Sequence, residues 1–420
     1  MLVNSVKIHD LAKYLIKFQI YYNCVIKFCI GHLGIPSFAN YVTDLVTLVL
    51  MMLMLYCRHF TIKKSSQFTV AMMFVIVVII SYIGNGYSAM LLIWGGRNLF
   101  RFYLFFFACI YFLDVCDFDN IMSGLKILFW VNIVLILYQK WGLNYIGDAC
   151  SGLYSLGNIS GGNGSVNILM YVVVCYVLAE QSEKKMKVRT TILYLISAFA
   201  VAAVIELKYF FIEMIVIIFI YVGVKRKSIR TWGFLCVSLL ALFWGIDLLQ
   251  KINPSFAGFF QIQEIIDDSM QYGVSEQVGR LSGMRVMLEN YLTTPFQKLF
   301  GIGLGNADYS SSFDVFTSSF YRQHYSLTYY YFMSAWMMVE TGILGTITYL
   351  LMFLLAIYKS WKMCKTKDFH AYAAFMLCIS ALLQFFYNQM LRVETSGYLL
   401  QLTLALVFIM QKEKIKMRKY

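Results

Sequence analysis

Charged residues are scarce in this chain: Asp, Glu, Lys and Arg make up 14% of its 420 residues, whereas hydrophobic residues make up 60%. A soluble protein of this composition would expose large apolar patches, which soluble proteins avoid. The shortage of charge therefore excludes an ordinary soluble protein. It predicts an all-α, polytopic integral membrane protein, because helices satisfy their own backbone groups inside a bilayer.

Proline is also rare, and Pro36, Pro254 and Pro295 all lie outside the long apolar runs, as its missing N–H group favours. Runs of roughly 17 to 25 apolar residues can cross a hydrocarbon core as helices. We expect about 12 transmembrane helices, at about 10–32, 37–57, 68–84, 98–114, 125–140, 166–181, 190–206, 209–223, 231–249, 333–357, 370–388 and 396–411. Lysines interrupt the first run, so an amphipathic helix on the membrane surface is an alternative for it.

Basic residues are distributed unevenly between the connections of these runs. They cluster at 58–64, 184–189, 225–230, 359–367 and 412–419, whereas the alternating connections hold mainly Arg97, Lys208 and Arg392. Because cytoplasmic loops carry the excess of Lys and Arg, both termini are predicted inside. One large periplasmic loop, at 250–327, then lies between helices 9 and 10. Topology explains the net charge of +13, so no nucleic-acid partner is expected.

Cysteine is absent from the interval 250–327, and the chain has no CxxC or Cys/His spacing of the kind that binds metal ions. We therefore expect neither a disulfide framework in this loop nor a metal site. The predicted organisation has three parts. Residues 1–249 contain helices 1–9, residues 250–327 form the outer loop with an amphipathic helix, and residues 328–420 contain helices 10–12 and a basic cytoplasmic tail.

The outer loop contains two arginines beside a predicted amphipathic helix. From Arg280 to Leu292, apolar residues recur at helical spacing, with Arg280 and Arg285 on the flanks of the apolar stripe. Arginine binds phosphate and diphosphate groups by bidentate hydrogen bonds, which suits both residues to an anionic substrate. For Arg285, an ion pair with Glu289 one turn later is the alternative.

Alternating glycines follow this helix, in the run Gly301-Ile-Gly303-Leu-Gly305. Glycines at alternate positions allow positive φ angles and close backbone approach, so their N–H groups could form a pocket for an oxyanion. The run lacks the Lys-Ser/Thr of a P-loop and follows a helix instead of a strand, which excludes a nucleotide-binding motif.

Aromatic and hydroxyl residues are dense between 309 and 332, and they suit either sugar rings or a membrane interface. His324 is the only histidine of the outer loop and lies between Arg322 and Tyr325. Its unperturbed pKa would let it exchange a proton near neutral pH, although a lone histidine in a loop is more often ordinary than catalytic.

Ionisable residues within the apolar runs are few. Glu206, Lys208 and Glu213 lie close together around the turn between the seventh and eighth runs. They either pair with one another or leave Lys208 to bind a phosphate group.

Together these motifs resemble the O-antigen ligase and polysaccharide polymerase (Wzy-like) superfamily. The resemblance rests on the order of Gly-Arg at 279–280, the amphipathic helix, the FGIGLGN run, His324 and the segment ETGILG at 340–345. Members are bacterial inner-membrane enzymes with about a dozen helices and one large periplasmic loop late in the chain. The resemblance implies a metal-independent, cofactor-free glycosyltransferase whose substrate is an undecaprenyl-diphosphate-linked oligosaccharide.

The resemblance also implies residue roles. Arg280 matches the family's loop arginine best, with Arg285 as an alternative, and His324 matches its histidine, which would position or deprotonate the acceptor hydroxyl. Lys208 stands where many members carry an arginine. Glu340 completes the expected catalytic set with Arg280 and His324, where it would orient His324 or cap the loop. The alternative for Glu340 is that it only satisfies backbone groups. The expected substrate-binding set is completed by the following residues: Gly303, Gly305, Arg322 and Tyr325.

Several functions remain open at this point. A polymerase that joins repeat units into O-antigen, capsule or exopolysaccharide, with or without a chain-length regulator, is expected first. An O-antigen ligase that transfers glycan to lipid A core is the alternative. A flippase for the lipid-linked repeat unit belongs to another class, and the long outer loop argues against it. A non-catalytic membrane scaffold predicts that substitutions at Arg280 or His324 have no effect.

Overall fold

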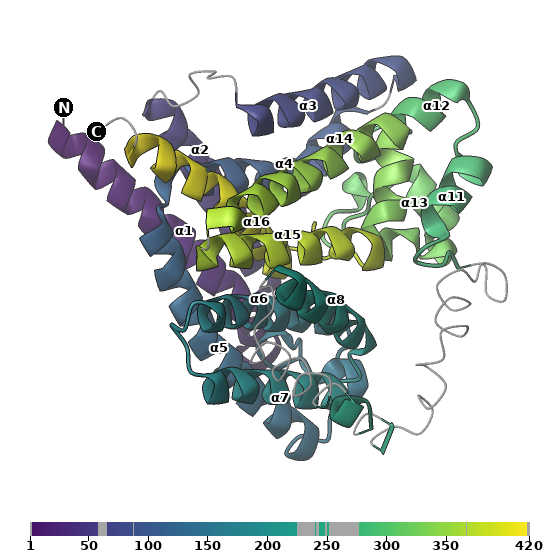
Figure 1. Cartoon of the computed structure of the whole chain (residues 1–420). Coiled ribbons are helices and arrows are strands. Elements are labelled where there is room, and N and C mark those ends of the chain that lie inside the picture. Colours follow the sequence, from purple (N-terminus) through teal and green to yellow (C-terminus); the bar gives the residue numbers. More distant parts are fainter. Residues whose placement is uncertain are drawn as a thin grey trace.

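The computed structural model describes residues 2–57, 65–86, 88–224, 240, 243–247, 250–251, 277–366 and 368–417. Every regular element in these ranges is a helix (Figure 1), which confirms the all-α class. The long helices are α1 (Leu2–Leu33), α2 (Val42–Tyr56), α3 (Ser66–Asn85), α4 (Ala89–Phe112), α5 (Val115–Trp141), α6 (Asn163–Ser182), α7 (Val188–Val204), α8 (Lys208–Val224), α14 (Met333–Met363), α15 (Phe369–Tyr387) and α16 (Glu394–Met417). Short helices lie between them: η1 (Ser37–Tyr41), η2 (Gly147–Ala149), η3 (Gly152–Tyr154), α11 (Gly283–Val286), η5 (Met287–Tyr291), α12 (Pro295–Phe300), η6 (Asp314–Phe316), α13 (Ser319–His324), η7 (Tyr325–Leu327), η8 (Tyr329–Tyr331) and η9 (Cys364–Thr366).

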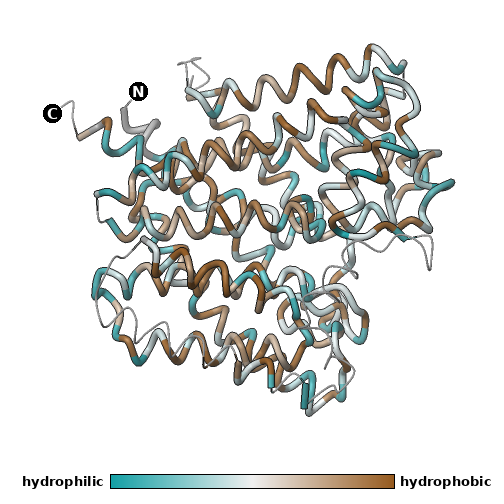
Figure 2. The backbone as a smooth tube through the Cα atoms, turned by 45° about the vertical axis from the view of Figure 1, so that its right-hand side comes forward, coloured by the Kyte–Doolittle hydropathy of each residue, from teal (hydrophilic) through white to brown (hydrophobic). Residues whose placement is uncertain are grey.

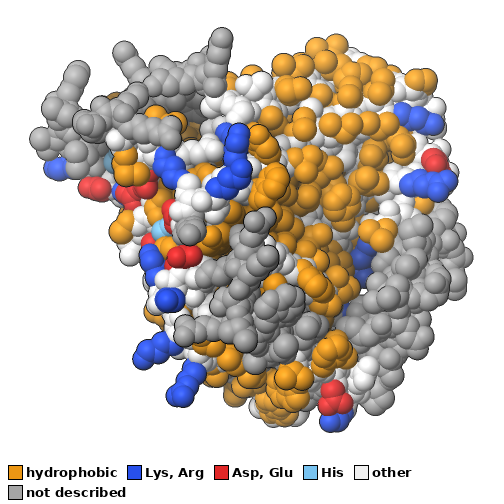
Figure 3. Space-filling view, viewed as in Figure 1, with side chains coloured by type: hydrophobic (Ala, Val, Ile, Leu, Met, Phe, Trp, Pro, Cys, Tyr) orange, Lys and Arg blue, Asp and Glu red, His pale blue; other side chains and the backbone are white. Residues whose placement is uncertain are grey.

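Each predicted apolar run except the ninth coincides with one of the long helices. The ninth run, 231–249, lies largely outside the described residues, as does the part of the outer loop from 252 to 276. Six helices in the described ranges are long and apolar enough to cross a membrane: Ser37–Tyr56, Ser66–Asn85, Val115–Trp141, Asn163–Ser182, Met333–Thr366 and Phe369–Tyr387. Hydrophobic side chains cover much of the face seen in Figure 3. The chain is therefore a helical protein with the features of a membrane protein.

Helix α5 corrects one boundary. The predicted helices at 98–114 and 125–140 leave residues 115–124 between them as a loop, but α5 already begins at Val115. The reason is a capping box, in which the Asp114 carboxylate accepts from the Asp117 backbone N–H at 2.8 Å and the Asp117 carboxylate accepts from the Asp114 N–H at 3.3 Å. These bonds satisfy backbone donors that a helix start otherwise leaves unpaired. The two acids that look like loop residues thus begin the helix.

The helix ends alternate between two ends of the bundle. At one, which we call the termini end, lie both chain termini and the connections α4–α5, α6–α7 and α14–α15 (Figure 1). At the other, which we call the loop end, lie residues 142–162, the α7–α8 turn, residues 277–332 and the α15–α16 connection. Hydrophilic residues gather toward both ends, whereas the helices between them are mainly hydrophobic (Figure 2).

Helix α1 packs against α2, α4 and α16, and its residues Ala12, Ile16 and Ile20 are buried along one face. The lysines that interrupt its apolar run point to acidic partners at the start of α5. Lys13 Nζ lies 2.7 Å from an Asp114 oxygen, and Lys17 Nζ lies 3.0 Å from an Asp117 oxygen. The charges that weaken the sequence signal of α1 therefore join this helix to its neighbour.

Helix α6 lies at the centre of the bundle, where it contacts α5, α7, α8, α15 and α16. Nearly all of its residues are buried, including Asn163 and Asn167 near its start. Because α6 begins at the loop end, its first turn brings polar side chains to the place where residues 142–162, the α7–α8 turn and the start of α14 meet.

Candidate functional site

A cavity of about 790 Å³ opens at the loop end. Its walls come from segments far apart in the chain: residues 146–148, the first turns of α6, the α7–α8 turn, Arg280, residues 331–332 and residues 387–390. Two of the predicted site residues, Arg280 and Lys208, line this one cavity. The structure thus brings these two cations to one cavity, and their role in substrate binding stays a prediction.

Arg280 is the most distinctive group of the cavity. Its guanidinium lies 4.5 Å from the ring centre of Tyr387 and 5.9 Å from that of Phe332, an arrangement in which aromatic faces support the cation. The side chain forms no hydrogen bond or ion pair with any residue that the structure describes, and its Nε atom is buried without a partner. Since a buried donor without a partner is costly, an anion in the cavity would give this guanidinium the partner that it lacks among the described residues.

Contacts of the segment 277–332 fix the backbone around Arg280. The Val278 N–H donates to the Leu327 carbonyl at 3.0 Å, and Val278 itself is buried. Gly283 packs against α14, where an added Cβ would lie 3.0 Å from the Ala335 methyl carbon. The arginine therefore enters the cavity from a segment anchored on both sides.

The α7–α8 turn supplies Lys208 together with Glu206, whose φ angle of 60° is unusual for a residue with a side chain. Glu213, one of the expected partners of Lys208, lies deeper and is fully buried. Its carboxylate accepts from Asn167 Nδ2 at 3.0 Å and from Gln384 Nε2 at 3.3 Å. Amides, and not the lysine, thus satisfy Glu213.

Asp148 also lines the cavity, in a connection that sequence reasoning left without any role. Asn163, the first residue of α6, donates through its Nδ2 atom to Asp148 Oδ1 and to the Ile205 carbonyl, the latter at 3.0 Å. The asparagine thereby joins the 146–148 segment to the end of α7. The sequence offered no signal for this residue, because a single aspartate in a loop is typical of solvent-exposed turns.

The glycine run folds as predicted but serves another purpose. Gly301, Gly303 and Gly305 have φ angles of 73°, 101° and 91°. The carboxylate of Glu340 accepts from the Gly305 N–H at 2.6 Å and from the Ala307 N–H at 2.7 Å. The Gly303 N–H donates to the Glu340 carbonyl at 3.0 Å. The oxyanion in this loop is thus a side chain of the protein. A substrate role for Gly303 and Gly305 stays a prediction, which these contacts do not support.

A break in helix α14 makes this arrangement possible. Gly342 has φ 63° and ψ −165°, so the helix is interrupted two residues after Glu340. The Ile302 N–H donates to the Val339 carbonyl at 2.8 Å. A Cβ atom on Gly342 would lie 2.5 Å from the Gly301 backbone nitrogen, so both positions require glycine. Among the roles expected for Glu340, its contacts fit capping the loop and satisfying its backbone N–H groups.

His324 lies outside the lining of the cavity. Its ring packs against Tyr291 and Phe320, with centroid distances of 5.0 and 4.6 Å, and burial lowers the pKa of the imidazole. Tyr325 is 60% exposed and does not line the cavity either. The structure therefore brings neither residue to Arg280, and their roles stay predictions.

The two remaining predicted arginines form ion pairs on the surface. Arg285 Nε lies 2.9 Å from Glu289 Oε1, one helical turn away, and both side chains are more than half exposed. Arg322 Nη2 lies 2.7 Å from Asp314 Oδ2. Neither arginine lines the cavity. The alternative interpretation of Arg285 as an exposed pair is confirmed. The structure does not bring Arg285 or Arg322 to the cavity, and their substrate roles stay predictions.

The predicted amphipathic helix also differs in detail. It consists of α11 and the π-helical turn η5, and its deepest side chains are Met287 and Leu292, both fully buried. Leu281, which the apolar stripe places inside, is 57% exposed. The extra residue in the π-helical turn rotates the buried face relative to the regular helical spacing.

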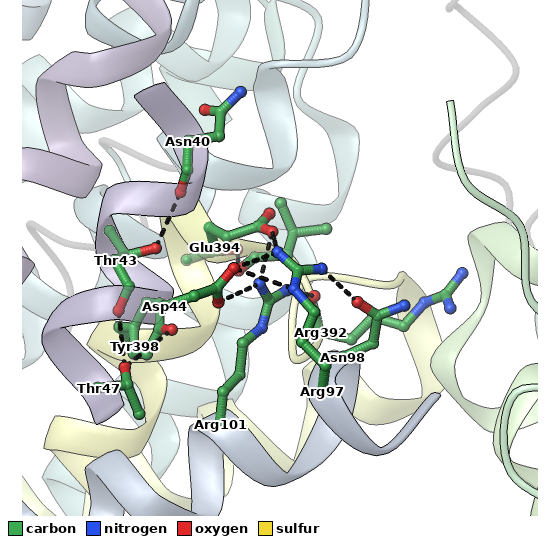
Figure 4. A network of polar contacts seen from close by, with 12 residues as sticks. Asn40, Thr43, Asp44, Thr47, Arg97, Asn98, Arg101, Arg392, Glu394 and Tyr398 are labelled. Carbon is green, nitrogen blue, oxygen red and sulfur yellow. Dashed lines mark hydrogen bonds and ion pairs between the residues drawn. The ribbon is translucent and has the colours of Figure 1, made fainter. Parts of the chain in front are cut away.

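A network of charged side chains beside the glycine run was not predicted. Arg97 and Arg101 of α4 contact Asp44 of α2 and Glu394 of α16 (Figure 4). Arg101 Nη1 lies 3.1 Å from Asp44 Oδ1 and 2.7 Å from Glu394 Oε1. Two arginines one helical turn apart within an apolar run are a signal of such a network, since they share a face and require acidic partners.

A second buried pair joins this network to the glycine run. Arg392 Nη1 lies 3.0 Å from Asp308 Oδ1, and Asn98 Nδ2 donates to Asp308 Oδ2 at 2.7 Å. The Arg101 guanidinium also donates to the Arg392 carbonyl at 3.3 Å. These contacts fix the last part of the glycine loop to α4 and to the segment before α16.

No protein-family model matches the chain, and a comparison with curated proteins finds no match either.

Proposed function

We propose that this chain is a polysaccharide polymerase. It joins undecaprenyl-diphosphate-linked oligosaccharide repeat units into O-antigen, capsule or exopolysaccharide chains at the periplasmic face of the bacterial inner membrane. The observation that carries the proposal is the Arg280 guanidinium. It lines a large cavity at the end of a hydrophobic helical bundle and forms no hydrogen bond or ion pair with a carboxylate of the described residues.

The cavity suits a diphosphate group. Arg280 and Lys208 provide two positive charges in one lining, and an arginine binds phosphate oxygens through a planar set of N–H donors. In a glycosyl transfer from such a donor, the bond between sugar C1 and the diphosphate oxygen breaks, and negative charge develops on the departing group. Fixed cations stabilise this developing charge, which lowers the barrier of the reaction.

The cavity also suits a sugar. Tyr331, Phe332 and Tyr387 lie in its lining beside polar side chains such as Asn388 and Gln389. Sugar rings present apolar C–H patches and hydroxyl edges, so flat aromatic rings next to amides can bind both.

The orientation follows from charge. Lys184, Lys185, Lys362 and Lys365 lie at the termini end, and cytoplasmic loops carry the excess of basic residues. We therefore propose twelve spans, both termini in the cytoplasm and the loop end in the periplasm. A topology reporter fused at Ser311 should give a periplasmic signal, whereas a cytoplasmic signal would reverse the orientation.

The activity is tested in a strain that lacks the gene and carries plasmid-borne variants. Arg280→Ala should abolish long-chain polysaccharide on a gel, at unchanged abundance of the protein in the membrane. Arg280→Lys, which keeps the charge but loses the bidentate geometry, should retain part of the product. Lys298→Ala removes a cation of the outer segment that does not line the cavity, and it should leave the product unchanged. A normal chain-length distribution in the Arg280→Ala strain would contradict the proposal.

The same gel separates polymerase from ligase. A strain that lacks the gene should lose the ladder of chain lengths and keep a single repeat unit on lipid A core, because ligation still proceeds. Loss of all attached units, with polymer left on the lipid carrier, would identify a ligase instead.

A further inference from the structure

The cavity contains carboxylates as well as cations. Among the described residues of its lining, the acidic ones are Asp148 and Glu206, and both share the cavity with Arg280 and Lys208. A diphosphate leaving group needs the cations alone. The acids therefore require a separate explanation. The other reactant of a glycosyl transfer is a sugar hydroxyl, which must lose its proton, and a carboxylate can accept that proton.

Asp148 has the geometry of a positioned carboxylate. Its Oδ1 atom accepts from Asn163 Nδ2, while Oδ2 forms no hydrogen bond with any residue in the described part of the chain. The Asn163 amide is fixed in turn by the Ile205 carbonyl, at 3.0 Å. One oxygen thus sets the orientation of the carboxylate and the other remains for a ligand in the cavity. A proton acceptor needs such a fixed orientation before its basicity matters.

The surroundings make this carboxylate a stronger base than an ordinary aspartate. Burial raises the pKa of the Asp148 carboxyl, and the negative charge of Glu206 raises it further, whereas the Asn163 hydrogen bond and the Arg280 charge oppose the rise. The other ionisable groups in the lining are those of Lys208, Tyr331 and Tyr387. A base whose pKa moves toward the working pH is a more effective proton acceptor.

We propose that Asp148 is the general base of the glycosyl transfer, an inference that rests on the proposed function. Asp148 Oδ2 takes the proton of the acceptor hydroxyl while that oxygen forms a bond to C1 of the donor sugar. The bond from C1 to the diphosphate oxygen breaks, and the electron pair leaves with undecaprenyl diphosphate beside Arg280 and Lys208. His324, which the family resemblance implies for this step, does not line the cavity.

The test uses the purified full-length protein in lipid nanodiscs. Lipid-linked repeat units extracted from the strain that lacks the gene serve as the substrate, and single-turnover rates are measured from about pH 5 to 9. Asp148→Asn, which keeps the shape of the side chain, should lower the rate by about 100-fold or more. Binding of undecaprenyl diphosphate, measured separately, should stay within about twofold of the wild type, since Arg280 and Lys208 are unchanged. The matched control, Asp314→Asn, changes an exposed aspartate of the outer segment and should keep the wild-type rate.

The pH profile distinguishes a base from a structural residue. In the wild type the rate should fall at low pH as the carboxylate takes up a proton, and this limb should be absent in Asp148→Asn. Asp148→Glu, which keeps a carboxyl group, should restore part of the rate together with the low-pH limb. A Glu variant as inactive as the Asn variant, with binding of undecaprenyl diphosphate also lost, would assign Asp148 a structural role and overturn the inference.

The two proposals fail in different ways. If Asp148→Asn keeps the wild-type rate while Arg280→Ala is inactive, the polymerase proposal stands and the role of Asp148 is refuted. The role of Asp148 is also refuted if His324→Gln, and not Asp148→Asn, removes the low-pH limb. If the wild-type protein forms no polymer from the lipid-linked units, the proposed function itself is wrong, and with it the inference.

Discussion

Replacement of Glu340 tests whether this buried acid is structural. Its side chain is fully buried, and each carboxylate oxygen accepts from one backbone N–H of the glycine loop, at 2.6 and 2.7 Å. In Glu340→Gln the amide oxygen still accepts one of these bonds, but the NH2 group faces the other backbone donor. A buried donor left without a partner costs about 1–3 kcal/mol. Glu340→Ala leaves both donors unpaired, so we expect about twice that loss, about 2–6 kcal/mol, together with a cavity.

The measurement is thermal unfolding of the detergent-solubilised protein, followed by intrinsic tryptophan fluorescence. The midpoints should fall in the order wild type, Glu340→Gln, Glu340→Ala. Glu289→Gln, which changes an exposed acid paired with Arg285, is the matched control and should unfold with the wild type. A Glu340→Gln protein that is inactive but as stable as the wild type would refute the structural role and return Glu340 to the catalytic set.

Three further predictions concern the loop end. Arg392→Gln leaves the buried Asp308 without its cation and should cost about 3–5 kcal/mol of stability. The double variant with Asp308→Asn should recover part of this loss. Equal thermal unfolding midpoints for the single variant and the wild type would contradict the prediction. Gly95→Ala places a Cβ atom 2.3 Å from the Gly305 nitrogen and should lower the midpoint, whereas Gly96→Ala, whose Cβ meets nothing within 3.5 Å, should not. Asp148→Asn should be at least as stable as the wild type at pH 7. Folding raises the pKa of the Asp148 carboxyl, so the unfolded chain releases the carboxyl proton at a lower pH than the folded protein. The wild type therefore loses stability relative to the variant as the pH rises above about 4. A parallel pH dependence of the stability of the two proteins would contradict this prediction.

The helices could be predicted because apolar runs of sufficient length leave the backbone few other structures. Their boundaries were harder to predict, since the charged residues at the start of α5 act as caps and not as a loop. The positive φ angles of the glycine run were predictable from residue type alone. The group that these N–H donors bind was not predictable. Glu340 reaches Gly305 because of the break at Gly342, and this break depends on how two backbone segments pack.

The candidate site shows the same division. Arg280 and Lys208 could be selected as cations on the outer side of predicted spans, and both line the cavity. His324 is nearer in sequence to the tenth predicted span than Arg280 is, yet its ring packs against Tyr291 and Phe320 and not in the cavity. Asp148 was missed because its importance comes from Asn163 and from the cavity, and no local pattern around an aspartate records either. The sequence thus identified two cations of the cavity, whereas only the folded structure shows which residues lie together in it.

The charged network of Figure 4 has a consequence for biogenesis. Arg101 of α4 and its partner Glu394 of α16 are separated by 293 positions along the chain. Until α16 leaves the ribosome, Asp44 is the one carboxylate among the described residues that pairs with the two arginines of α4, which then carry an excess positive charge. A chain that stops before α16 therefore keeps an uncompensated cation inside the bundle, and it differs electrically from the finished protein.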